Sequence, residues 1–265
     1  MTALSDTHCH LDFPDFEEDR DAVIERARQA GLERILIPAI DLESSRKVVE
    51  LARMNESIFA AVGVHPNQAD QFGPETIAGL KELAREPKVV AIGEIGLDFY
   101  REFVGEDIQA EAFNHQLEMA AELGLPVIIH NREATETVLN LLSEWHSNLV
   151  EFESDLVERS GVLHSYSEGL ETAQEAREIG LYLGITGPIT FKNASTLRET
   201  VSEIPLDRLL IETDSPYLSP EPFRGRRNEP AHVRFVAEKI AELHGTSIEV
   251  VSDQTSENAR KLFLW

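Results

Sequence analysis

Several histidines and carboxylates in this sequence stand where a short apolar run ends. Imidazole nitrogens and carboxylate oxygens are ligands that divalent transition metals accept, so this choice of residue types indicates a metal site. The candidate ligands are His8, His10, Glu94, His130, His164 and Asp214.

His8 and His10 are separated by one residue after the first apolar run. Side chains of an extended chain alternate in direction, so both imidazoles point to one side while Cys9 points to the other. The two rings can therefore reach the same ion. His130 and His164 each close an apolar run, where a hydrogen-bonded core histidine is the alternative interpretation.

Glu94 follows the apolar run 89–93, where a carboxylate is costly to bury unless it is paired or bound to a metal. Its two oxygens can bridge two cations roughly 3.5 to 4 Å apart. We therefore expect two divalent ions. One set of ligands is His8, His10, Glu94 and Asp214, and the other is Glu94, His130 and His164.

Mixed imidazole and carboxylate ligands suit Zn, Mn, Co or Ni, and Mg is less natural beside so many histidines. Such a pair of ions would acidify a bridging water and neutralise the charge that builds on phosphorus. This chemistry predicts hydrolysis by in-line attack of water, with Glu94 and Asp214 as catalytic groups. Asp214 also serves as the base that takes the water proton, although a turn residue before Ser215 and Pro216 is its alternative role.

These side chains must be positioned by strands, because short apolar runs alternate with longer amphipathic stretches along the chain. The expected strands are residues 3–8, 34–40, 58–64, 88–94, 126–130, 161–164, 181–186 and 208–212. Helical spacing is present in residues 17–30, 44–54, 74–85, 107–123 and 133–145. Repeated strand and helix predict parallel pairing.

Gly31, Gly124 and Gly180 stand where a helix should end, as left-handed residues commonly do. Eight strand–helix units in 265 residues predict an α/β protein with the (β/α)8 TIM barrel fold and an extra C-terminal helix over residues 248–263. An open doubly wound sheet is the alternative. We expect one domain over residues 1–265, with the acidic stretch 147–160 as a solvated excursion.

Composition excludes several classes of protein. The chain carries 24 Lys and Arg against 48 Asp and Glu, a net charge of -24, so it cannot present a broad basic face to nucleic acid. The acidity is typical of salt-adapted proteins or of compositional drift, and an anionic substrate must meet local cations or metal ions. The single cysteine, Cys9, excludes a disulfide framework.

We expect no membrane partner, because no apolar run approaches the roughly 20 residues of a membrane span. The N-terminal segment has neither the basic region nor the long apolar stretch of a signal peptide. These features favour a cytoplasmic protein, and nothing in the sequence implies an obligate protein partner.

The expected substrate contacts lie just beyond the strands. Guanidinium groups suit phosphate oxygens, and Arg224, Arg226 and Arg227 form the densest basic patch, with an acid-neutralising turn as the alternative. We also expect His65 and Arg132 to hold substrate phosphate. Tyr100 and Phe99 could stack on a base, as aromatic residues do for single strands, with simple packing of a loop as the alternative.

The sequence resembles the TatD family of metal-dependent hydrolases, within the amidohydrolase superfamily. The motifs that carry the resemblance are residues 6–12 (DTHCHLD), 63–66 (GVHP), 93–100 (GEIGLDFY), 126–130 (PVIIH), 212–218 (ETDSPYL) and 222–230 (PFRGRRNEP). They extend over nearly the whole chain. The resemblance implies a barrel with two metals held by the six candidate ligands named above.

The resemblance also implies phosphodiester hydrolysis by a DNase or 3'-5' exonuclease. The acidic charge of the chain favours single-stranded or short DNA, a nucleic acid that the protein grips locally, over a long duplex bound by a whole face. One alternative is a D-aminoacyl-tRNA deacylase or another metal-dependent ester or amide hydrolase. A binding module without catalysis is a further alternative, which the presence of every proposed ligand disfavours.

Overall fold

The structure is a computed structural model that describes residues 3–101 and 103–265. Its strands are β1 (Leu4–Asp6), β2 (Leu32–Pro38), β3 (Ile58–Val62), β4 (Val89–Asp98), β5 (Val127–Arg132), β6 (Gly161–Leu163), β7 (Leu181–Ile185) and β8 (Leu209–Ile211). They form one sheet in the order β1 to β8. The pairs β1–β2, β3–β4, β4–β5, β5–β6 and β7–β8 are parallel.

The last strand is hydrogen-bonded to the chain that leaves the first. Thr7, which follows β1, donates its backbone N–H to the carbonyl oxygen of Ile211 in β8 at 3.2 Å. A sequential parallel order with this connection is the topology of a (β/α)8 barrel. The predicted fold class is therefore confirmed.

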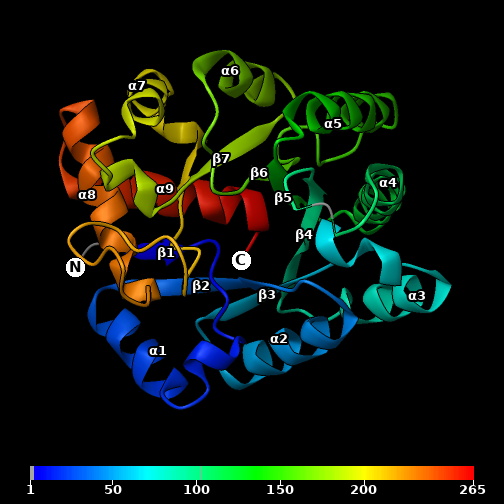
Figure 1. Ribbon diagram of the computed structural model, residues 1–265, viewed down its shortest axis with the longest axis horizontal. Helices are drawn as coiled ribbons and strands as arrows, with labels where there is room; N and C mark the ends of the chain where they lie inside the picture. Colours follow the sequence, from blue (N-terminus) through cyan, green and yellow to red (C-terminus); the bar gives the residue numbers. More distant parts are fainter. Residues whose placement is uncertain (1–2, 102) are drawn as a thin grey trace. The chain divides into compact units, whose positions relative to one another are not determined.

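Helices follow the strands, as the alternating pattern predicted (Figure 1). They are α1 (Arg20–Gln29), α2 (Leu42–Met54), α3 (Pro74–Leu83), α4 (Glu106–Leu123), α5 (Thr135–Glu151), α6 (Leu170–Glu178), α7 (Ser195–Glu203), α8 (Val233–His244) and α9 (Ile248–Phe263). Gly31, Gly124 and Gly180 have φ values of 95°, 67° and 76°, so the predicted left-handed residues at helix ends are confirmed. The extra C-terminal helix, α9, has the predicted bounds.

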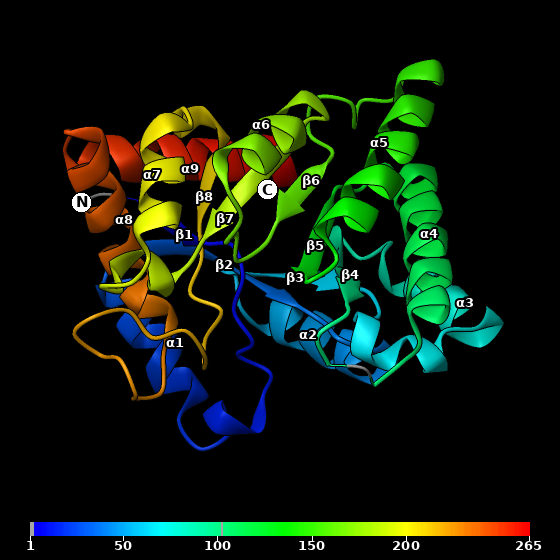
Figure 2. The same ribbon diagram turned by 45° about the horizontal axis from the view of Figure 1, so that its top comes forward.

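The chain divides into two compact units. The first unit comprises the chain up to Ile37, Ser165–Gln174 and Tyr182–Lys261. Within it α8 packs against α7, β1 and β8, and α7 and α8 lie side by side in Figure 2. The second unit comprises Pro38–His164, Glu175–Leu181 and Leu262–Trp265. Within it α2 packs against β3 and α4 packs against β4.

Two expected boundaries are wrong. Residues 147–160 were expected to be a solvated excursion, but α5 continues to Glu151. The buried side chains of α5 recur at helical spacing, at Val138, Leu142, Trp145 and Leu149. Because Leu149 lies within the expected excursion, this buried face explains why the helix continues there.

Strand β4 was expected to end at Glu94, but it continues to Asp98. Its pairing with β5 shifts register between Ile92 and Ile95, so Glu94 lies at an irregularity inside the strand. Such a bulge re-aims a side chain. No helix in residues 3–101 and 103–265 combines the length and the apolar character that a bilayer span requires.

Candidate metal centre

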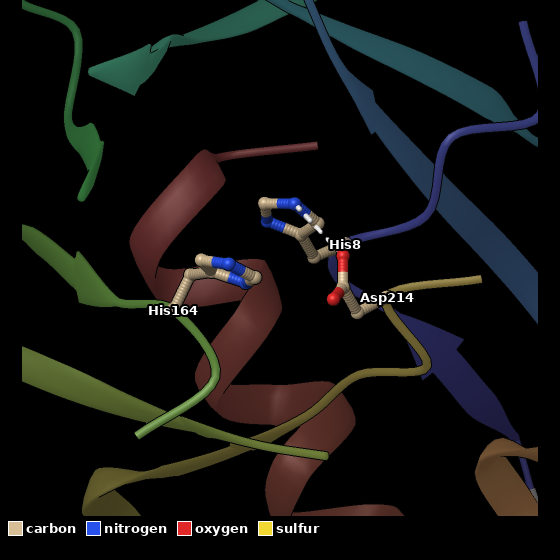
Figure 3. Close-up of side chains that lie close together, drawn as sticks. All are labelled: His8, His164 and Asp214. Carbon is tan, nitrogen blue, oxygen red and sulfur yellow. Dashed lines mark ion pairs between the residues drawn. The ribbon is translucent and has the colours of Figure 1, made fainter. Parts of the chain in front are cut away.

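In the first unit, His8, His10 and Asp214 form a group that we call the β1–β8 cluster. His8 Nε2 lies 3.3 Å from His10 Nε2, so the two imidazoles share one side of the chain as their spacing predicted. The carboxylate Oδ1 of Asp214 lies 3.8 Å from His8 Nε2 (Figure 3) and 3.6 Å from His10 Nε2. Both histidines are buried.

Backbone hydrogen bonds hold this cluster. His10 donates its N–H to the Ser215 carbonyl at 2.8 Å, and Asp214 donates its N–H to the His8 carbonyl at 2.8 Å. Asp214 has φ 52°, a left-handed conformation that aspartate tolerates better than most residues. The segments that carry the three side chains are thus tied to each other directly.

Asp6 supports the β1–β8 cluster from the end of β1. Its carboxylate accepts hydrogen bonds from Thr213 N at 2.9 Å, Thr213 Oγ1 at 2.5 Å and His8 N at 3.3 Å. Burial raises the pKa of Asp6 to about 8 in spite of these donors, and the charge of Glu212 adds to the rise. Asp6 therefore connects the backbone of His8 to the residue before Asp214.

Glu212 is a second buried carboxylate of the first unit. It accepts hydrogen bonds from Ser165 N at 3.0 Å and Thr7 Oγ1 at 3.4 Å. A Cβ at Gly184 would lie 2.2 Å from Glu212 Oε1, so this glycine leaves the space that the carboxylate fills. Ser165 directly follows His164 in the chain and has φ 47°. Glu212 thereby fixes the backbone next to a predicted ligand.

In the second unit, five side chains form a group that we call the β3–β6 cluster: His65, Glu94, Asp98, His130 and His164. Glu94 Oε1 lies 2.8 Å from His130 Nδ1, 3.4 Å from His164 Nε2 and 3.8 Å from His65 Nε2. The carboxylate is buried among imidazoles. The predicted meeting of Glu94 with His130 and His164 is present in this unit.

Asp98 was not predicted to belong to the site. Its Oδ2 lies 3.4 Å from His130 Nε2, so His130 has a carboxylate at each ring nitrogen. Burial alone would raise the pKa of Asp98, but the hydrogen bond and charge of His130, with donors from Arg101 and Asn67, lower it to about 2. Burial likewise lowers the pKa of His130, but its hydrogen bonds to Asp98 and Glu94 outweigh that effect and raise it.

Two buried glutamines of α4 hold the strand ends that carry this cluster. Gln109 accepts the N–H of Asp98 at 2.9 Å and donates to its carbonyl at 3.1 Å. Gln116 accepts the N–H of Val64 at 2.7 Å and donates to its carbonyl at 3.1 Å. Each amide thus takes the place of a peptide group from a neighbouring strand, just before His65 or at Asp98.

The orientation of His65 follows from one hydrogen bond. Its Nδ1 accepts the N–H of Asn67 at 3.1 Å, so the proton of the neutral ring lies on Nε2. That nitrogen faces Glu94. His65, which we predicted as a phosphate contact, therefore lies in the β3–β6 cluster as a donor.

The donor chemistry fits a divalent metal. In the second unit, Glu94 Oε1 lies 2.8 Å from His130 Nδ1 and 3.4 Å from His164 Nε2. The β1–β8 cluster offers two imidazoles and a carboxylate in the first unit. Buried groups of this kind are stable when they are paired or hold an ion, and imidazole with carboxylate suits transition metals.

The expected substrate contacts have mixed outcomes. The Arg132 guanidinium lies over the ring of Tyr100, with Cζ 3.8 Å from the ring centroid, so the structure brings these two together. In the first unit, Arg224 lies over Phe191 at 4.2 Å. Arg227 pairs with Asp19 at 2.7 Å, so it has the acid-neutralising role that was the alternative for this patch.

Asp6, Asp98 and Glu212 were within recognised motifs, but sequence reasoning gave them no role. The signal that could have found them is the one used for Glu94, a carboxylate directly beside an apolar run. Phe13 was also missed. Its ring stacks on His10 at 4.5 Å, and Tyr217 meets it edge-on at 6.3 Å.

Comparisons with known proteins relate nearly the whole chain to one family. The family described as TatD related DNase matches residues 5–264. The uncharacterized metal-dependent hydrolase YabD of Bacillus subtilis is 44% identical over 260 residues, which cover 98% of each chain. The 3'-5' ssDNA/RNA exonuclease TatD of Erwinia amylovora is 40% identical over 266 residues, which cover 98% of this chain and 99% of that protein.

Among solved structures, YJJV, a TatD homologue from Escherichia coli K12, matches with a TM-score of 0.91 and 32% identity. The match covers 99% of this chain and 98% of that chain. These similarities extend over almost the full length of both partners in each comparison.

Proposed function

The chain belongs to the TatD related DNase family, and we propose that it is a two-metal hydrolase of phosphodiester bonds. Its proposed substrate is single-stranded DNA, from which it removes nucleotides as a 3'-5' exonuclease. A relative with 40% identity carries the name of a 3'-5' ssDNA/RNA exonuclease, which supports this choice. The observation that carries the proposal is the gathering of imidazoles and carboxylates in each of the two clusters.

We assign the ligands as the residue types indicate. His8, His10, Asp214 and Glu94 would hold one ion, and Glu94, His130 and His164 would hold the other. Zn, Mn, Co, Ni or Mg are the candidates, with the nitrogen-rich set favouring the transition metals. When bound, two such ions lower the pKa of a water molecule and neutralise charge on the phosphorus centre.

The chain's own groups move the protons in this proposal. Asp214 takes the proton of the attacking water, and its side chain is 15% exposed, so water can reach it. His65 donates its Nε2 hydrogen to a phosphate oxygen, because Asn67 fixes its tautomer. Asp98 Oδ2 lies 3.4 Å from His130 Nε2, and its charge would draw the ring proton to that nitrogen and leave Nδ1 for the ion.

Arg132, Tyr100 and Arg224 are the proposed substrate contacts outside the set of metal ligands. The stacked guanidinium of Arg132 keeps its donors in one plane, which suits phosphate oxygens. Tyr100 presents a ring that can stack on a base. Arg224 is held over Phe191 and would contact a more distant phosphate.

All catalytic groups come from one chain, which we propose acts as a single domain over its 265 residues. We also propose that it works in the cytoplasm, where its one buried thiol, Cys9, stays reduced.

The test of this function is metal removal and reloading. The chelated protein should lose turnover, and one or more of the five candidate metals should restore it. Activity is measured on end-labelled single-stranded DNA, D-aminoacyl-tRNA and a simple phosphodiester. Shortening of the DNA from its 3' end supports the proposal. Chelator-insensitive turnover would contradict it, and cleavage of D-aminoacyl-tRNA alone would replace it with a deacylase.

A further inference from the structure

The loop that follows β4 presents two aromatic side chains to solvent. Tyr100 is 55% exposed and Phe103 is 68% exposed. Leaving a phenylalanine in water forgoes the favourable free energy of burying its ring. A single exposed aromatic residue is ordinary, whereas two within four residues of one loop indicate a binding surface.

Each of these rings has an arginine over it. Arg132 Cζ lies 3.8 Å from the Tyr100 centroid, and Arg101 Cζ lies 5.9 Å from the Phe103 centroid. Among the ion pairs of the described residues, neither arginine is joined to a carboxylate. The chain has twice as many acidic as basic residues, yet these two guanidinium groups lie over aromatic rings. Their positive charge is therefore available to an anionic ligand.

Buried groups hold the two ends of this loop, at residues 98–101 and at Val104. Asp98 Oδ1 accepts the N–H of Tyr100 at 3.1 Å and of Arg101 at 3.0 Å. Gln109 holds the Asp98 backbone and also donates to the Val104 carbonyl at 2.8 Å. The backbone before Tyr100, at Asp98, and the backbone after Phe103, at Val104, are therefore both hydrogen-bonded to the buried Gln109 amide.

The same contacts join the loop to the β3–β6 cluster. Asp98 contacts His130 through its other oxygen, and Arg132 lies two residues after His130 on β5. Phe99 donates its N–H to the Arg132 carbonyl at 2.9 Å. The two arginine–aromatic pairs thus begin at the proposed catalytic groups and lead along the loop toward α4.

We propose that the pairs Arg132–Tyr100 and Arg101–Phe103 form a subsite for two successive unpaired nucleotides next to the scissile phosphate. This inference rests on the proposed function and names how its substrate strand is held. Each ring offers a face on which a base stacks, and each guanidinium offers N–H donors to the phosphate beside that base. Bases in a duplex are already stacked and paired, so the subsite selects single strands.

Binding of hexathymidylate with nuclease-resistant phosphorothioate links tests this subsite. The metal-loaded protein is titrated against the labelled strand, and fluorescence anisotropy gives Kd. Phe103→Ser should raise Kd about tenfold, whereas Phe103→Tyr should keep the affinity because it keeps the ring. Arg101→Gln should raise Kd and make the slope of log K against log salt shallower by about 0.7, the value for one lost single-strand phosphate contact.

Phe152→Ser is the matched control, because Phe152 is 79% exposed at the end of α5 and has no part in the proposed subsite. It should leave Kd unchanged. The strand can also be changed, by replacing the base that stacks on Phe103 with an abasic residue. This strand should bind the wild-type protein more weakly than the intact strand does. It should bind Phe103→Ser with the same affinity as the intact strand, because that variant has already lost the ring. Unchanged Kd in both Phe103→Ser and Arg101→Gln would overturn the subsite.

Cleavage of unmodified hexathymidylate by the wild-type protein separates the two proposals. If the wild type cleaves this strand while both variants bind it normally, the subsite is wrong and the nuclease function stands. If the variants bind weakly but the wild type cleaves no strand, the surface binds single strands and the proposed reaction is wrong.

Discussion

His130 lies between two carboxylates, so its tautomer is the residue-scale property on which the proposed metal binding depends. Asp98 faces Nε2 at 3.4 Å, and Glu94 faces Nδ1 at 2.8 Å. Asp98 Oδ2 also accepts a hydrogen bond from Asn67 at 3.3 Å, which holds the carboxylate in place. With the proton on Nε2, the Nδ1 lone pair is available to an ion.

Asp98→Asn tests this role. The amide can place its nitrogen opposite His130 Nε2 and Asn67, which disfavours the tautomer with the hydrogen on Nε2. We expect metal affinity to fall about 10- to 100-fold, as measured by calorimetric titration. Asp70→Asn, which changes an exposed acid in η2 (Pro66–Gln71), should not alter the affinity. An unchanged metal Kd in Asp98→Asn would show that Asp98 does not orient His130.

At this scale, residues were predictable where one local rule decides the direction of a side chain. Alternation in an extended chain places His8 and His10 on one side, and the structure confirms it. Asp98 was beyond such a rule, because the expected strand ended at Glu94. Its contact with His130 depends on the β4–β5 register, where Gly96 faces His130 and Asp98 faces Arg132. The sequence of one strand does not contain that register.

At the scale of elements, the end of β8 is positioned by close packing between a buried carboxylate and a glycine. Gly184 in β7 leaves room for Glu212, which in turn holds the N–H of Ser165. This arrangement joins β7 to the segments that follow β6 and β8. Gly184 has no side chain, but it is important for the site because it leaves the space that Glu212 occupies.

Gly184→Ala should therefore displace Glu212 and weaken its hydrogen bond to Ser165. We expect the free energy of unfolding to fall by about 1 to 3 kcal/mol, as overpacking of a dense core does. Urea denaturation measures this change. In a Glu212→Ala background the clash is relieved, so Gly184→Ala should cost much less there. Strictly additive effects would mean that the methyl group does not act through Glu212.

A second element-scale contact joins α1 to the loop after β8. Arg227 donates to Asp19 at 2.7 and 2.8 Å, and Arg26 donates to Asp19 at 3.4 Å. The hydrogen bonds from Arg227, more than any other cause, lower the pKa of Asp19 to about 2 from its ordinary value of 3.8. Because the folded-state pKa is depressed, this contribution to stability is full above the ordinary value and is lost as pH falls toward 2.

Asp19→Asn should consequently lower the free energy of unfolding at pH 6, and the difference from wild type should shrink as pH falls below about 4. The measurement is urea denaturation over that pH range. Asp21→Asn, which changes an exposed acid at the start of α1, is the control and should show no such trend. A wild-type advantage that stays constant down to pH 2 would contradict the ion-pair explanation.

Element boundaries were predictable where a turn residue marks them, as Gly31, Gly124 and Gly180 do. The error at α5 arose because acidic composition in residues 147–160 was given more weight than spacing. Trp145 and Leu149 continue the buried positions of that helix, so burial of two side chains extends the element past the change in composition. The extension of β4 arose from pairing with β5 beyond the irregularity at Glu94.

At the scale of the whole molecule, the net negative charge opposes binding of nucleic acid, whereas the groups proposed to bind and cleave it are local. The net charge of -24 repels a polyanion at long range, while the imidazoles, carboxylates and ring-bound arginines are concentrated at strand ends. An acidic protein can act on nucleic acid if attraction is local and metal ions supply positive charge. The alternation of strands and helices predicted this fold from the sequence alone, because each repeat unit is local.

The central claim is that two metal ions bind per chain, through His8, His10, Glu94, His130, His164 and Asp214. The metal content of the reloaded protein tests this claim most directly. Elemental analysis should find two ions per wild-type chain. Glu94→Ala should hold at most one and lose at least about a thousandfold in kcat, roughly 4 kcal/mol, while its thermal melt still shows a folded protein. One ion or fewer in the reloaded wild type, or two ions and full turnover in Glu94→Ala, would contradict the account.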